Sequence, residues 1–101
     1  MTPKQLKKHR QRLNEFERSP QGKTAAQLVS LATKIGRIRD NRGKEPTYVR
    51  ETDPALSPPL SIPGHTGDLK IGTVLSIVAR LQSDLDEWEI HHANAKPTDS
   101  H

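Results

Sequence analysis

The sequence predicts an α+β domain in which helices pack on one face of a small three-stranded antiparallel sheet. Residues 24–35 and 71–90 space their apolar side chains three and four positions apart, so each segment forms an apolar stripe along a helix. Three short runs rich in strand-forming residues lie between them. Two amphipathic helices need a shared apolar surface, and one face of a sheet provides it. With a further N-terminal helix, the expected order is helix, helix, strand, strand, strand, helix.

Composition limits the chain to one domain with a small core. Its 101 residues are 31% hydrophobic and include one Phe, one Tyr and one Trp. There is no cysteine, so neither a disulfide nor a thiolate metal site can stabilise the fold. No segment resembles a signal peptide or an apolar span of about 18 residues. We therefore expect a cytoplasmic protein without membrane contact, and no cofactor or metal is indicated.

Charge is divided unevenly along the chain. Residues 1–44 hold 12 Lys or Arg and 3 Asp or Glu, whereas residues 45–101 hold 4 and 9, so the two parts carry charges of +9 and −5. A basic segment can displace the counterions of a nucleic acid and bind its phosphates without reading the sequence. The same charge can also serve solubility alone.

The first helix is expected over residues 3–18, where Pro3 suits the opening turn. Its narrow apolar stripe consists of Leu6, Leu13 and Phe16. Basic residues surround this stripe, and two interpretations are open: the helix lies across a phosphate backbone, or it is a solvated arm that frays. Turn-forming residues at 19–22 then break the helix. Residues 1–22 are therefore expected to form a basic N-terminal helix or arm.

The second helix is expected to begin at Thr24 and to end at Ile35. Thr24 and Gln27 have the spacing of a capping box, in which each side chain accepts a hydrogen bond from the backbone N–H of the other residue. Gly36 follows, where a left-handed C-terminal cap is common. The buried face is expected to consist of Leu28, Leu31, Ala32 and Ile35. A short first strand is expected at residues 37–39.

The middle of the chain predicts a hairpin and a third strand. Residues 40–43 are turn formers, and residues 47–51 favour a strand. The proline-rich residues 53–59 are expected to form an irregular connector. The third strand is expected at residues 60–62, before a Pro-Gly pair ends it.

The closing helix is expected over residues 71–90. Its apolar stripe should consist of Ile71, Val74, Leu75, Val78, Leu81, Leu85 and Trp88. Trp88 falls on this stripe and is therefore expected to anchor the core rather than to stack on a base. His91 and His92 point in different directions on a helix, so they do not predict a metal site. Residues 93–101 are polar and should form a disordered tail.

Two motifs around the third strand and the closing helix resemble a known family. Ile62-Pro63-Gly64-His65 and Leu69-Lys70-Ile71-Gly72-Thr73 are similar to the I/V-P-x-H turn and the L-K-x-G-T segment of the HicA (YcfA-like) toxins, which are small RNA-cleaving proteins. The resemblance implies a double-stranded-RNA-binding-like fold for residues 23–92. It also implies that the chain is the mRNA interferase of a type II toxin–antitoxin pair, working without a metal, and that an antitoxin protein covers its RNA-binding face.

One position departs from the family pattern. Family members usually carry a histidine in the first hairpin, as in a G-S-H triplet, and it is regarded as catalytic. The aligned triplet here is Gly43-Lys44-Glu45. A carboxylate can act as a general base when burial favours its protonated form, whereas neighbouring cations, here Arg42 and Lys44, favour the ionised form. Glu45 is therefore either a substitute catalyst or an ordinary solvated residue in a phosphate-binding loop.

His65 is the histidine that the predicted fold places best for chemistry. Cleavage of RNA without a metal needs a base for the 2′-hydroxyl proton, an acid for the leaving oxygen and a cation for the charged intermediate. His65 lies in a predicted core turn and is expected to be the acid or base; the alternative is a turn histidine that hydrogen-bonds nearby backbone. Contacts to RNA are expected from Arg37, Arg39, Arg42, Lys44, Lys70 and Thr73. The last two open the closing helix, where backbone donors favour an anion, although Asp68 is equally suited to cap that helix.

Three functional classes are consistent with these residues. The first is a metal-independent endoribonuclease in which His65 and Glu45 are catalytic. The second is a non-catalytic RNA-binding module that has lost the hairpin histidine. The third is a protein-interaction adaptor, which would use the acidic residues of the closing helix, namely Asp84, Asp86, Glu87 and Glu89. The adaptor predicts no salt-sensitive RNA binding.

Overall fold

The computed structural model describes residues 2–40, 46–52, 54–64 and 67–95 of the chain. Its elements are, in order, α1 (Pro3–Arg18), α2 (Ala25–Ile35), β1 (Ile38–Asp40), β2 (Thr47–Arg50), β3 (Leu56–Ser61) and α3 (Ile71–Ala95). The predicted α+β class and the predicted order of elements are both confirmed. In the described ranges, none of the helices has the length and apolar character needed to cross a membrane.

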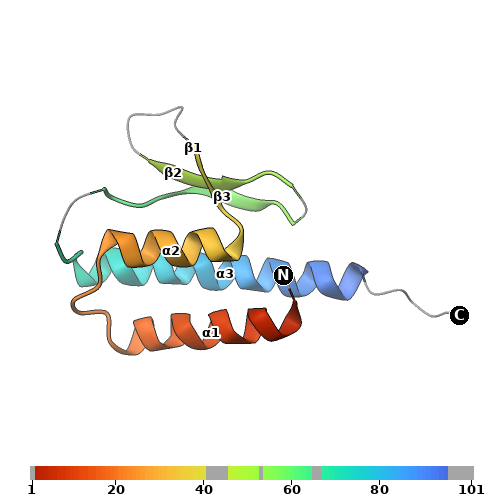
Figure 1. The fold of residues 1–101 in the computed structure, drawn as a ribbon, viewed down its shortest axis with the longest axis horizontal. Coiled ribbons are helices and arrows are strands. Elements are labelled where there is room, and N and C mark those ends of the chain that lie inside the picture. The colour runs from red at the N-terminus through yellow and green to blue at the C-terminus, as the bar shows by residue number, and fades with distance from the viewer. Residues whose placement is uncertain (1, 41–45, 53, 65–66, 96–101) are drawn as a thin grey trace, which may run out of the picture.

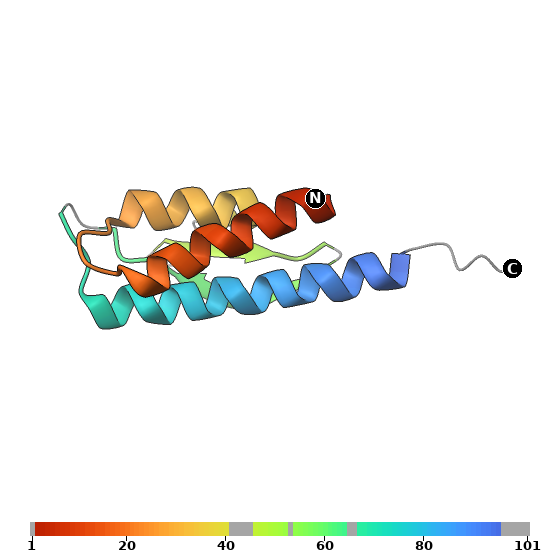
Figure 2. The ribbon, with the colours of Figure 1, turned by 90° about the horizontal axis from the view of Figure 1, so that it is seen from below.

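The elements form three layers. The strands make one antiparallel sheet in the order β1-β2-β3, and α2 and α3 lie side by side beneath one of its faces (Figure 1). Viewed from below, α1 lies across the seam between α2 and α3, on the side away from the sheet (Figure 2). The core therefore has two parts, one between the sheet and the helix pair and one between the helix pair and α1.

The first helix is part of the packed core. Thr2 and Gln5 cap it, since the Gln5 N–H donates to Thr2 Oγ1 at 3.2 Å and the Thr2 N–H donates to the Gln5 side chain at 2.9 Å. The stripe of Leu6, Leu13 and Phe16 is buried, and α1 packs mainly against α3. The expectation of a solvated arm is therefore wrong, because three apolar side chains at the right spacing are enough to seat a helix on a seam between two others.

The caps predicted for the second helix are confirmed. The Gln27 N–H donates to Thr24 Oγ1 at 3.4 Å, and the Thr24 N–H donates to the Gln27 side chain at 2.8 Å. Gly36 ends the helix with φ of 113°, the left-handed conformation that a glycine adopts without strain. The chain then turns directly into β1, which begins one residue later than expected.

The third strand is longer than predicted. It includes Pro58 and Pro59, which the sequence assigned to an irregular connector. The register shifts by two residues between the pairs Tyr48↔Leu60 and Arg50↔Leu56, so the prolines fall in a bulge rather than opposite partners. Because β3 is an edge strand, the missing proline N–H groups cost little.

Arg37, which was expected to contact RNA, is instead buried at the junction of α2 and β1. Its guanidinium donates to both carboxylate oxygens of Asp84 in α3, from Nε at 2.6 Å and from Nη2 at 2.9 Å. Its Nη1 donates to the carbonyls of Tyr48 at 2.7 Å and Pro58 at 3.2 Å. The predicted RNA contact is therefore wrong, because Arg37 is only 1% exposed and four of its five N–H groups donate to partners inside the fold. Asp84 is likewise lost from the acidic surface expected of the closing helix.

The closing helix is confirmed but its buried face is shifted. Val74, Val78, Leu81, Leu85 and Trp88 are buried as expected, and so is Ile77. The Trp88 Nε1–H donates to the Ile35 carbonyl at 2.6 Å, which confirms its role as a core anchor. Ile71 and Leu75 were expected on this face but are 44% and 39% exposed. The helix continues through Ala95, so residues 93–95 of the expected tail are helical, since no helix breaker precedes Pro97; residues 96–101 lie outside the described part of the chain.

If α1 belongs to the core, Leu13→Ala should lower the free energy of unfolding by about 2–5 kcal/mol, because a fully buried leucine leaves a cavity. Urea denaturation followed by circular dichroism measures this. The matched control is Leu75→Ala on α3, which is partly exposed and should cost clearly less. A neutral Leu13→Ala would mean that α1 does not pack in solution.

The buried ion pair predicts a second effect on stability. Asp84→Ala should lower the free energy of unfolding by about 3–5 kcal/mol, because it leaves the Arg37 charge buried without a partner. Asp86→Ala, which removes an exposed carboxylate two residues away, should cost less than about 1 kcal/mol. Equal effects in chemical denaturation would contradict the pairing.

Candidate functional site

Four of the predicted site residues lie outside the described part of the chain. These are His65 and Glu45, the two candidates for catalysis, and Arg42 and Lys44, two of the candidates for RNA contact. Their described neighbours, however, fix where the two segments leave the fold.

The residues that flank these segments meet at one end of the sheet. Thr47 pairs with Ser61, so the start of β2 lies beside the end of β3. Just beyond this pair, a Cβ built on Gly64 would lie 3.8 Å from Cγ of Pro46, which is ordinary van der Waals contact. We call these four residues the sheet end. In sequence, Glu45 immediately precedes Pro46 and His65 immediately follows Gly64.

Three other predicted RNA contacts are described, one in β1 beside the sheet end and two at the start of α3. Arg39 is exposed in β1, one residue before Asp40, which pairs with Thr47. Lys70 is exposed, and its carbonyl accepts the Val74 N–H at 3.0 Å, so Lys70 occupies the N-cap position of α3. Thr73 is half-buried in the first turn of α3. Figure 1 shows α3 beginning on the side where β3 ends, so the start of this helix faces the same end of the molecule.

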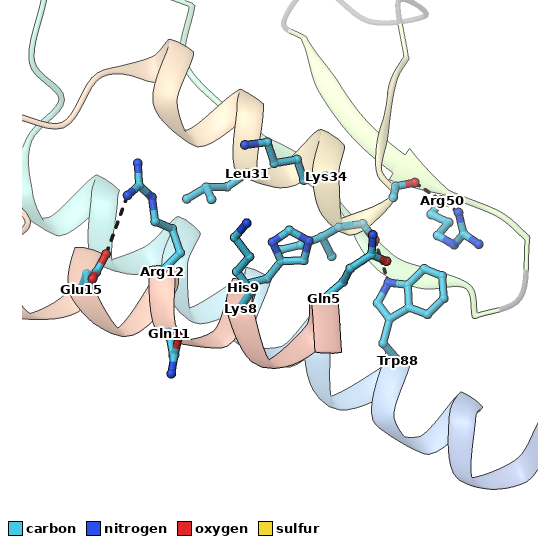
Figure 3. Close-up of a pocket in the computed structure, with 12 residues that line it drawn as sticks. Gln5, Lys8, His9, Gln11, Arg12, Glu15, Leu31, Lys34, Arg50 and Trp88 are labelled. Carbon is cyan, nitrogen blue, oxygen red and sulfur yellow. Dashed lines mark hydrogen bonds and ion pairs between the residues drawn. The ribbon is translucent and has the colours of Figure 1, made fainter. Parts of the chain in front are cut away.

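A groove that the sequence did not predict runs between α1 and α2 (Figure 3). Its volume is about 850 Å³. Lys8, His9 and Arg12 of α1 line one side, and Lys34 of α2 lines the other. We call this the α1–α2 groove. A signal for it exists in the sequence, because these basic residues flank the apolar stripes of their helices, and residues that flank two packed stripes face each other across the seam.

One end of the groove is lined by Arg50, Trp88 and Gly36, which contact one another closely. Arg50 stacks over Trp88, with Cζ 4.7 Å from the ring centroid, and its Nε donates to the Pro54 carbonyl at 3.0 Å. Gly36 sits so close that a Cβ there would lie 3.1 Å from Arg50 Nη1. Arg50 thus serves to build the wall of the groove.

His9 reports the electrostatics of the groove. Partial burial lowers the pKa of His9 below its ordinary value of 6.5, and the charges of Lys34 and then Lys8 lower it further. The folded state therefore binds fewer protons at His9 than the unfolded chain does around this pH. The lowered pKa of His9 therefore contributes to the free energy of unfolding above about pH 6.5, and this contribution is lost as the pH falls through the pKa of the folded state.

The described residues contain no group of three or more His, Cys, Asp or Glu side chains that could hold a metal ion. Comparison of the chain with protein-family models, with curated proteins and with solved structures found no match. The resemblance to the HicA toxins consequently depends on the two motifs around residues 62–73.

The groove electrostatics can be measured at His9. Histidine NMR titration should place the pKa of His9 below 6.5, and Lys34→Gln should raise it by removing a nearby positive charge. Lys7→Gln, an exposed lysine of α1 that does not line the groove, should leave it unchanged. A His9 that titrates at or above 6.5 would contradict the groove as described.

Proposed function

We propose that the protein binds RNA and cleaves it without a metal, as a HicA-like toxin component. The observation that supports this is the closeness of Pro46 and Gly64 at one end of the sheet, where a Cβ built on Gly64 would lie 3.8 Å from Cγ of Pro46. In sequence, Glu45 immediately precedes Pro46 and His65 immediately follows Gly64. A general acid and a general base must reach the same phosphodiester, and residues that are adjacent in sequence to two neighbouring points of the fold can satisfy this.

The reaction requires two proton transfers. A base takes the proton of the 2′-hydroxyl as that oxygen attacks the adjacent phosphorus, and an acid gives a proton to the 5′-oxygen as its bond to phosphorus breaks. His65 supplies one of these groups, and Glu45 is the candidate for the other. Arg39 lies in β1 beside the residue that pairs with Thr47, and Lys70 precedes α3; these two cations would hold the phosphate charge together with Arg42 and Lys44.

The alternative is an RNA-binding module without catalysis. It is favoured by the carboxylate at position 45, where the family carries a histidine. The adaptor alternative is weakened, because Asp84 is buried and both Asp86 and Glu89 are paired with Arg10. In either RNA-binding case we expect an antitoxin partner that covers the RNA-binding face in the cytoplasm.

A cleavage assay on labelled RNA, with and without EDTA, tests the proposal. Cleavage should survive EDTA and fall by about 10²–10⁴ in His65→Ala. Glu45→Ala should show a comparable loss if the carboxylate is the second proton-transfer group. Glu87→Ala and His101→Ala are matched controls for the loss of a carboxylate and of an imidazole, and both should cleave normally.

The outcomes separate the functional classes. RNA that is bound but not cut would assign the protein to the class of RNA-binding modules without catalysis. A gain of cleavage in Glu45→His would then show that the missing hairpin histidine is the reason for the inactivity. RNA that is neither bound nor cut at low salt would refute the proposed function.

A further inference from the structure

The α1–α2 groove carries more positive than negative charge. Among the described residues that line it, Glu15 is the single carboxylate, and it stands 3.8 Å from Arg12 in an exposed pair that water weakens. Across the described ranges, neither Lys8 nor Lys34 has an ion-pair partner. The groove therefore presents cations that the fold itself does not neutralise.

The other side of α1 shows the contrast. Arg10 donates to Asp86 at 2.8 Å and also to Glu89, both on α3, so its charge is offset within the fold. Burial is the first cause of the lowered pKa of His9, and the further lowering by Lys34 and Lys8 agrees with an excess of positive charge on the side that faces α2. Helix α1 thus pairs Arg10 with carboxylates of α3, whereas Lys8 on the side facing α2 has no ion-pair partner among the described residues.

The cations continue from the groove toward the start of α3. A second hollow of about 260 Å³ shares Arg12 and Lys34 with the groove and extends it to Phe16. Lys23 Nζ lies 4.9 Å from the centroid of the Phe16 ring. The Lys23 carbonyl accepts the Leu69 N–H at 2.8 Å, so Lys23 lies close to the segment that precedes α3. Positive charge therefore extends from the groove to the start of α3, on the side of the molecule where β3 ends (Figure 1).

We propose that the α1–α2 groove and Lys23 form a track that binds the phosphate backbone of RNA and leads it to the sheet end. This rests on the proposed function, since it takes RNA as the ligand. Lys8 and Arg12 are four residues apart, about 6 Å along the helix axis, and so present their charges in a row to a linear polyanion. A phosphate backbone suits such a row better than an acidic peptide does, because it repeats its charge at every unit whatever the sequence.

The track contacts phosphates rather than bases. Trp88, the aromatic residue that lines the groove, is only 6% exposed and is engaged with the Ile35 carbonyl and with Arg50. It offers no face on which a base could stack. The track therefore adds affinity without sequence preference, and any sequence preference belongs to the sheet end.

The test compares two double variants that lose the same charge. Lys8→Ala/Lys34→Ala removes two groove lysines, and Lys4→Ala/Lys7→Ala removes two exposed lysines of α1 that do not line the groove. Binding of a labelled 2′-O-methyl oligonucleotide is titrated at several salt concentrations, because this probe lacks the attacking hydroxyl and cannot be cut. The groove variant should bind about tenfold more weakly at 0.1 M salt, and its salt dependence should fall by about 1.4 in logarithmic slope, or 0.7 for each lost phosphate contact. The control should change little, and thermal melting should confirm that both variants fold.

Each outcome supports or overturns the track. A selective loss in the groove variant supports it, as does a rise in the pKa of wild-type His9 when the oligonucleotide is added, because phosphates would offset Lys34 and Lys8. Equal binding by both variants overturns the track and leaves the proposed function standing. No binding by the wild type at low salt overturns both. Displacement of the oligonucleotide by poly-glutamate at equal charge, with the same dependence on the groove lysines, would assign the groove to an acidic protein instead.

Discussion

The buried guanidinium of Arg37 is the interaction on which the arrangement of the other elements depends. From the junction of α2 and β1 it binds Asp84 of α3 and the carbonyls of Tyr48 in β2 and Pro58 in β3. A buried charge is tolerated only when its hydrogen-bonding capacity is met, so these elements must come together in one geometry. The contact with Pro58 falls where the register of β2 and β3 shifts, so the same arginine fixes the bulge that accommodates the prolines.

Features set by neighbouring residues were predictable, and features set by distant partners were not. The capping box of Thr24 and Gln27 and the cap at Gly36 follow from local sequence, and the structure confirms them. Arg37 was misassigned because its partner is 47 positions away, and a count of charges does not reveal burial. The extent of β3 was misjudged for a similar reason, since prolines become acceptable in a strand only when it is known to lie at an edge.

The uneven charge of the sequence is partly cancelled inside the fold. Arg37 and Arg10 belong to the basic part of the chain, and both are paired with carboxylates of the acidic part on α3. The +9 and −5 of the two parts therefore do not describe the surface, because some cations are paired with α3 and others, such as Lys8 and Lys34, are not. The position of α1 decides which these are, because it turns Arg10 toward α3 and Lys8 toward α2.

This double use of α1 links stability to binding. The stripe that contains Leu13 seats the helix on α2 and α3, and the residues flanking that stripe form one wall of the α1–α2 groove. The groove cannot exist unless the stripe is packed, and mutual repulsion among its cations works against that packing. A bound polyanion would relieve the repulsion, so ligand binding and the docking of α1 must strengthen each other by the same free energy. The first helix is thus a part of the core whose attachment a ligand in the groove would strengthen.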